Sequence, residues 1–207
     1  MTRLLATAAL LTLVGCTALT GPREIAASQP TEWRSVATSA DRQRLREWRA
    51  AFVEALTKAR AAGQGAAILA EGPLLVPDAA TGGAPIPSGN YRCRVIKLGA
   101  KRAGMLDFVS YPAFDCQIRQ EGQLQRFTKT SGSQRPIGVI FHGDALRQVF
   151  LGTLVLGDER RAMQYGRDPD RDLAGFVERI GPARWRIILP RPAFESKLDV
   201  IELIPAS

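Results

Sequence analysis

Apolar and polar residues alternate in two segments of this chain, Tyr91-Arg-Cys-Arg-Val-Ile-Lys97 and Ala113-Phe-Asp-Cys-Gln-Ile-Arg119. A period of two is typical of a β-strand that is buried on one face. In the second segment it places Phe114, Cys116 and Ile118 on the apolar face. Both segments therefore predict strands, and they are the first of a longer series.

The same period continues to Ile204, with a turn signal at each break. Glycine, proline and aspartate gather in these breaks, as in His142-Gly-Asp144 and Gly181-Pro182. Short strands separated by regular turns are typical of an antiparallel barrel or sandwich. We predict an antiparallel β domain of about eight to nine strands over residues 91–205. The expected strands are 91–98, 106–110, 113–119, 123–130, 136–142, 146–156, 173–180, 184–190 and 197–204.

A helical arm is expected before the strands, over residues 31–71. Thr38 or Ser39 can cap an amphipathic helix that ends at Gly63. Its apolar stripe is Leu45, Trp48, Phe52, Leu56 and Ala59. We expect this stripe to dock on the β domain, above the 146–156 segment, which is apolar on both faces. Residues 72–90 are rich in proline and glycine and predict a stiff linker. The fold class is therefore α+β, mainly β.

Residues 1–15 resemble a bacterial secretion signal. Arg3 supplies a positive charge, and the apolar run from Leu4 to Val14 is too short to span a bilayer. The run ends in Leu13-Val-Gly-Cys16, which resembles a lipobox, so Cys16 is the expected lipidation site. Residues 16–30 are expected to be a lipidated tether. The acyl chains would make the membrane a partner, at the periplasmic face of the outer membrane, because Thr17 stands where inner-membrane lipoproteins have Asp. A secretion signal with an incidental cysteine is the alternative.

Cys93 and Cys116 remain as an even pair in an oxidising compartment. No CxxC spacing is present, and a disulfide between neighbouring strands is expected to contribute roughly 3 kcal/mol.

The chain is basic, with 28 Lys and Arg against 20 Asp and Glu. The basic residues are spread along the sequence, and no nucleic-acid recognition motif occurs, so we expect no nucleic-acid partner. A surface that pairs with lipid headgroups or acidic glycans is the alternative to a solvated basic surface.

Few residues suggest chemistry. The backbone near Gly132, with Ser133, Gln134 and Arg135, could contact an anion or another ligand; Arg135 could equally tie down a loop. Glu202 shares a face with apolar neighbours and is a candidate buried acid, with an arginine ion pair as its default.

The single histidine, His142, lies before a turn, so a histidine metal site is excluded. The sequence Asp168-Pro-Asp-Arg-Asp172 lacks the Gly and Glu of a calcium loop. No catalytic residue, metal or cofactor is expected.

Motifs are spread over most of the chain: Trp33-Arg-x-x-Ala-Thr, Trp48-Arg-x-Ala-Phe, Gly89-x-Tyr-Arg-Cys-Arg, Gly132-Ser-Gln-Arg-Pro, Gly181-x-x-Arg-Trp-Arg and Phe194-Glu-Ser-x-Leu-Asp-Val-Ile-Glu-Leu. Together they resemble a family of uncharacterised proteobacterial envelope proteins, called domain of unknown function 4893. The resemblance covers residues 33–205 and transfers no activity, because the family's function is unassigned. A Gly-x-Tyr opening and a disulfide-bearing small barrel are also similar in architecture to periplasmic metalloprotease inhibitors and avidin-like binders, which implies nothing about function.

We expect a lipid-anchored, non-enzymatic binding module whose cavity or loop rim takes a small ligand or a protein partner. The alternative is an envelope hydrolase or glycan-processing enzyme that uses inward-facing carboxylates, Glu202 with Glu195 or Glu178. Such a pair requires two carboxyl groups roughly 5–10 Å apart in an open cleft.

Overall fold

The computed structural model describes residues 30–206. Within them all nine predicted strands are present, with ends shifted by no more than two residues. The strands are β1 (Gly89–Ala100), β2 (Phe108–Ser110), β3 (Phe114–Glu121), β4 (Leu124–Lys129), β5 (Gln134–Phe141), β6 (Arg147–Leu156), β7 (Asp172–Gly181), β8 (Arg184–Pro190) and β9 (Ser196–Pro205). The helices are α1 (Trp33–Val36), α2 (Ser39–Arg46), α3 (Trp48–Ala61), α4 (Gly65–Ala70) and the 3₁₀-helix η1 (Gly72–Leu75).

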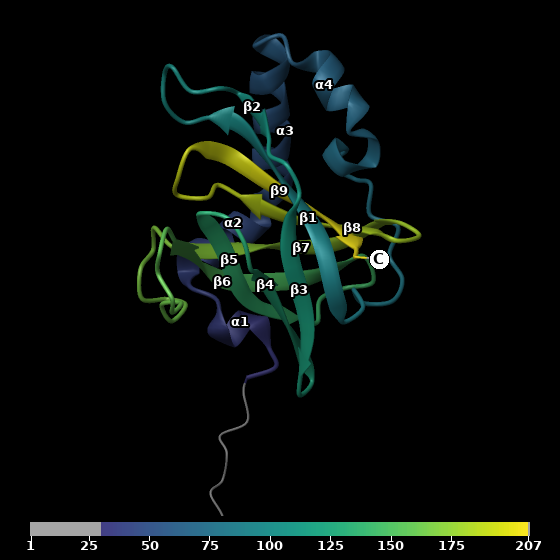
Figure 1. The fold of residues 1–207 in the computed structure, drawn as a ribbon, viewed down its shortest axis with the longest axis vertical. Coiled ribbons are helices and arrows are strands. Elements are labelled where there is room, and N and C mark those ends of the chain that lie inside the picture. The colour runs from purple at the N-terminus through teal and green to yellow at the C-terminus, as the bar shows by residue number, and fades with distance from the viewer. Residues whose placement is uncertain (1–29, 207) are drawn as a thin grey trace, which may run out of the picture.

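Eight of these strands close into an antiparallel barrel (Figure 1). The hydrogen-bonded order runs from β1 through β3 to β9, and β9 pairs back with β1 along nearly its whole length. Strand β1 is long enough for two partners on its other edge: its first half pairs with β3 and its second half with the short β2. Of the two predicted architectures, the structure is therefore the barrel, with β2 as an extra strand.

The predicted disulfide between Cys93 and Cys116 is confirmed. It joins β1 to β3 with a Cα–Cα distance of 5.8 Å, and both cysteines are buried in the barrel core. Tyr91 pairs with Cys116 in the strand register, and Cys93 pairs with Phe114, so the bond is diagonal across the ladder.

Alternate residues of every long strand fill the barrel. Trp185, Ile187 and Leu189 point inward from β8, as their alternation predicts, and pack with Ile201 and Phe150. Gly138 and Gly152 face each other across β5 and β6, and a Cβ on Gly138 would lie 2.3 Å from a backbone oxygen of β6. These paired glycines let the two strands approach and bend, which barrel closure requires.

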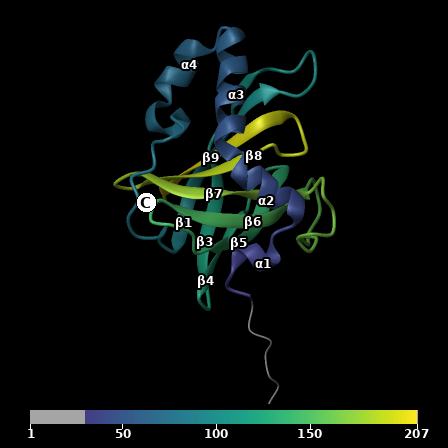
Figure 2. The same cartoon turned by 180° about the vertical axis from the view of Figure 1, so that it is seen from behind.

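A layer of helices covers part of the outer surface of the barrel (Figures 1 and 2). Thr38 caps α2, its side chain accepting a hydrogen bond from the backbone N–H of Asp41. The helix expected as one piece breaks at Glu47 into α2 and α3. Helix α2 packs over β7, where Leu45 joins a buried cluster with Leu151 and Ala174, whereas α3 packs over β1 and β9. The helices therefore lie mainly on other strands than the expected 146–156 segment. The break lets the two helices follow the curved surface.

The segment between η1 and β1, predicted as a linker, lies across one end of the barrel. Ile86 is buried in the barrel core. Its backbone N–H donates to Gln148 Oε1 at 3.2 Å, and its carbonyl accepts from Gln125 Nε2 at 2.7 Å. These bonds close that end. None of the helices in residues 30–206 is both long and apolar enough to cross a membrane.

Candidate functional site

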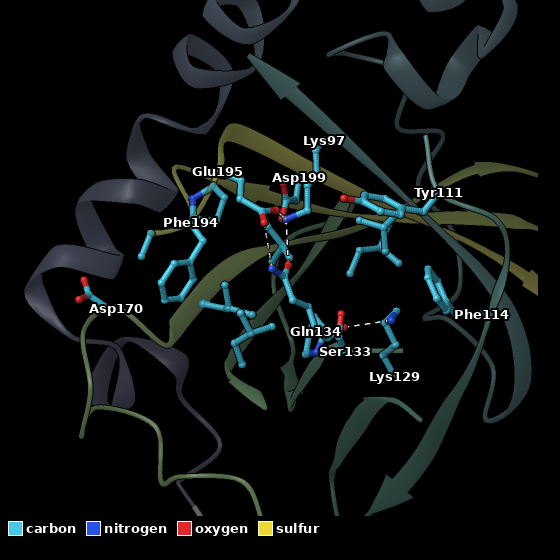
Figure 3. Close-up of a pocket in the computed structure, with 18 residues that line it drawn as sticks. Lys97, Tyr111, Phe114, Lys129, Ser133, Gln134, Asp170, Phe194, Glu195 and Asp199 are labelled. Carbon is cyan, nitrogen blue, oxygen red and sulfur yellow. Dashed lines mark hydrogen bonds and ion pairs between the residues drawn. The ribbon is translucent and has the colours of Figure 1, made fainter. Parts of the chain in front are cut away.

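The opposite end of the barrel is open and holds a cavity of about 150 Å³ (Figure 3). Its lining comes from residues near the ends of β1, β4, β6 and β8 and the starts of β3, β5, β7 and β9. Because antiparallel strands alternate in direction, these positions meet at one rim. The cavity is therefore a product of barrel closure.

The deeper wall of the cavity is apolar. Its side chains are inward-facing members of the strands, and most belong to the barrel core that continues below them. An apolar wall with a few convergent polar groups is the usual composition of a small-molecule site. The apolar lining is Val95, Leu154, Leu173, Leu189 and Ile201.

Lys97 organises the first group of polar side chains. Its ammonium donates to Gln134 Oε1 at 3.0 Å and to Asp199 Oδ2 at 3.2 Å, and lies 2.9 Å from Glu195 Oε2. The Ser196 hydroxyl donates to the other oxygen of Asp199. Burial lowers the pKa of Lys97, but the carboxylates of Asp199 and Glu195 outweigh burial, and the net direction is upward. Burial raises the pKa of Asp199. All three hydrogens of the Lys97 ammonium are thus occupied.

Lys129, on the other side of the cavity, has different surroundings. It is 3% exposed, and its ammonium donates to the carbonyl oxygens of Ser131 at 2.6 Å and Gln134 at 3.0 Å. The nitrogen lies 3.6 Å from the centroid of the Phe114 ring. Burial, with the nearby positive charges of Arg135 and Lys97, lowers the pKa of Lys129 to about 8.

A backbone loop between β8 and β9 forms one side of the rim. Phe194 packs against the barrel core, and Glu195 reaches toward Lys97 (Figure 3). Glu195 has a φ of 62°, and Arg191 in the same loop has a φ of 49°. Non-glycine residues rarely adopt this left-handed region, and such backbone often occurs at binding sites.

The predicted anion contacts divide between two environments. Ser133 and Gln134 line the cavity. Arg135 does not line it: its guanidinium donates to the carbonyls of Gly132, Gly157 and Glu159 at 2.7–2.8 Å. It ties two loops together. The cation of this segment that lines the cavity is Lys129.

Glu202 is buried, but on the outer face of β9. Its carboxylate pairs with Arg94 at 2.9 Å and Arg184 at 2.6 Å, under α4 and η1, and it does not line this cavity. The residues that it accompanies, Leu198 and Val200, pack against the helices. The expectation that the Glu202 face of β9 points into the barrel is therefore wrong. Both faces of the strand are buried, so burial by itself does not distinguish the inner face from the outer one. Its predicted partner Glu178 also pairs with arginine, at 2.6 Å from Arg186.

His142 lies at the other end of the barrel, where it lines a second cavity and its Nε2 is 3.1 Å from the carbonyl oxygen of Gln123. Asp168 and Asp172 accept hydrogen bonds from the backbone of their own loop. Within residues 30–206, no three His, Cys, Asp or Glu side chains are grouped as metal ligands.

Neither Lys97 nor Lys129 is among the site residues expected from the sequence, although each carries the same signal as Asp199. Lys97 continues the alternation of Tyr91 and Cys93, and Asp199 precedes Ile201 on the same face. A charged residue at the end of an inward-facing series marks a barrel rim. Lys129 carries the same signal, because it follows Phe127 on the inward-facing side of β4.

These features define a class: a small antiparallel β-barrel with an apolar-walled cavity at one end and a chain segment lying across the other end, beside a second cavity of about 150 Å³. Residues 33–203 match the family model described as Domain of unknown function (DUF4893), and the chain belongs to that family. No curated protein and no solved structure matches the chain. The predicted signal, Cys16 and most of the tether lie outside the described residues.

Proposed function

We propose that this protein is a non-enzymatic binding module that takes a small ligand in the open end of its barrel. The cavity of about 150 Å³ carries the proposal, because it combines an apolar wall with polar groups converging from several strands. A cavity of this size accommodates a group about as large as benzene. The ligand is therefore a small molecule, or a larger one that inserts a compact group.

The proposed location is the cell envelope, with Cys16 lipidated at the periplasmic face of the outer membrane. The lipobox-like sequence at 13–16 supports this location, and the Cys93–Cys116 disulfide is consistent with an oxidising compartment. The helical arm is proposed to act as an amphipathic helix docked on the barrel and not on the membrane, since Phe52, Leu56 and Ala59 pack against barrel strands.

A substitution that fills the cavity tests the proposal. Ala193 lies on the rim loop and lines the cavity, so Ala193→Trp places an indole there without removing a core side chain. Ala103→Trp, in the exposed β1–β2 loop, is the matched control. Saturation-transfer NMR with a library of small fragments should detect binders for the wild-type chain and the control, and lose them with Ala193→Trp. Binding that survives Ala193→Trp, or an absence of any binder, contradicts the proposal.

A hydrolase is the second candidate, with Glu195 kept and Asp199 in the place of Glu202. Glu195 and Asp199 share the cavity and both contact the Lys97 ammonium, which sets their carboxylates close together. Enzymatic action requires that the full chain release products from envelope glycans and that Glu195→Gln and Asp199→Asn each abolish this release. Ligand binding without turnover supports the binding module.

A further inference from the structure

Lys129 is a buried cation whose partners are all neutral. Its ammonium contacts two backbone carbonyls and the face of Phe114. In residues 30–206, the ion pairs at the cavity are those of Lys97 with Glu195 and Asp199. Since a buried charge is costly without a counter-charge, the cavity next to Lys129 lacks an anion.

The other charged groups around the cavity do not supply this anion. Glu195 and Asp199 are engaged by Lys97 on the opposite wall, and Asp170 belongs to the β6–β7 loop at the rim. Arg135, on the neighbouring strand, and Lys97 both add positive potential at Lys129. Figure 3 shows Lys129 beside Phe114, with Glu195 and Asp170 on the far side.

The loop after β4 is shaped to hold this lysine. Gly132 has a φ of 86°, and a Cβ there would lie 2.7 Å from Lys129 Nζ and 2.9 Å from the Phe114 ring. Only glycine lets the loop close over the ammonium and ring at once. The loop thereby places its carbonyls so that one ammonium hydrogen meets only the ring.

We infer that the ligand is a compact organic monocarboxylate, with its carboxylate on Lys129 and its apolar body against the Val95, Leu154 and Ile201 wall. This inference rests on the proposed function and names its substrate class. The carboxylate accepts the ammonium hydrogen that neither carbonyl accepts, forming a charge-assisted hydrogen bond. One uncompensated ammonium fits one carboxylate, and the cavity volume limits the body to about the size of a benzene ring.

Isothermal titration of the full chain with benzoate, and with benzamide as the neutral isostere, tests this inference. Benzoate is expected to bind about tenfold or more tightly than benzamide at pH 6.5, because a hydrogen bond to a charged group contributes that much. Lys129→Met removes the charge at similar length and should remove this preference. Lys197→Met is the matched control: Lys197 lies on β9, pairs with Glu54 outside the barrel and lines no cavity in the described chain.

The pH dependence of benzoate affinity tests the inference on the wild-type chain, so this test does not require that a variant folds. A bound carboxylate stabilises the Lys129 ammonium and raises the pKa of Lys129 above its value of about 8 in the protein without ligand. Benzoate affinity should therefore be constant below pH 7 and fall about tenfold per pH unit above pH 8, with proton uptake on binding near pH 8. Benzamide affinity should not change over this range. The buried Lys97 titrates above its ordinary pKa and does not produce this profile.

The outcomes separate the inference from the proposed function. Equal affinity for benzoate and benzamide, or a benzoate affinity that is constant from pH 6.5 to 9.5, overturns the monocarboxylate and leaves the cavity a site for neutral ligands. If neither benzoate nor benzamide binds, the monocarboxylate inference is overturned as well. The proposed function then fails only if the fragment library also contains no ligand that Ala193→Trp displaces.

Discussion

Replacement of Arg186 by methionine should destabilise the fold more than any surface substitution. Arg186 lies on β8, is completely buried, and points outward from the barrel into the helix layer. Its Nη2 is 2.6 Å from Glu178 Oε2, and its Nε donates to the same oxygen at 2.8 Å. The remaining donors reach the carbonyls of Pro73, Leu74 and Val76 at 2.8–3.1 Å and that of Pro77 at 2.8 Å. One guanidinium thus attaches η1 and the following segment to the barrel.

The magnitude follows from these contacts. Removal of one partner of a buried ion pair costs about 3–5 kcal/mol. Each carbonyl that loses its donor and stays dry adds about 1 kcal/mol, although water reaches some carbonyls because Pro73, Val76 and Pro77 are at least partly exposed. Methionine keeps apolar contact with Phe52, whose ring centroid is 5.3 Å from the guanidinium carbon. We expect the free energy of unfolding to fall by about 4–6 kcal/mol, equivalent to roughly 10–20 °C in Tm.

Urea unfolding, followed by tryptophan fluorescence and far-UV circular dichroism, measures this loss. Arg92→Met is the control, because the Arg92–Asp115 ion pair on β1 and β3 is more than half exposed at both side chains and should contribute less than about 1 kcal/mol. The double variant Arg186→Met/Glu178→Leu should lose less than the sum of its single variants, since both single variants break the same Arg186–Glu178 ion pair. Arg147, which also pairs with Glu178, loses its partner only where Glu178 is replaced. A loss for Arg186→Met no larger than that for Arg92→Met would refute the reasoning.

Three further predictions concern the disulfide, the site and the anchor. Replacing both Cys93 and Cys116 by alanine should lower the free energy of unfolding by about 3 kcal/mol, and an unchanged urea midpoint would contradict this. Gly132→Ala should weaken benzoate binding about tenfold in calorimetry, because its Cβ collides with the Lys129 ammonium; unchanged affinity would remove the loop from the site. Cys16→Ser should abolish metabolic labelling with a palmitate analogue, since Cys93 and Cys116 are buried in a disulfide; equal labelling would exclude lipidation at Cys16.

Local patterns in the sequence were sufficient to predict where the strands lie and, for several strands, which residues share the apolar face. Alternation in 184–190 distinguishes Trp185 and Ile187 from Arg184 and Arg186, and the structure places the apolar set inside the barrel. The cysteine pair predicts the disulfide because only two cysteines remain after Cys16. Period, turn residues and cysteine count depend on neighbours in sequence or on composition, so they are legible without coordinates.

Only the tertiary structure decided which buried face lies inside the barrel and which lies under the helices. Strand β9 is apolar on both faces, so alternation could not tell the Asp199 face, which points into the cavity, from the Glu202 face, which points at α4 and η1. Arg186 reads as a solvent-facing residue in the sequence, yet the helix layer buries it. The site depends on the same long-range contacts: Lys97 meets Asp199 because β9 closes on β1 and joins strands that are far apart in sequence. Closure and layering are set by contacts between distant segments, which no local period encodes.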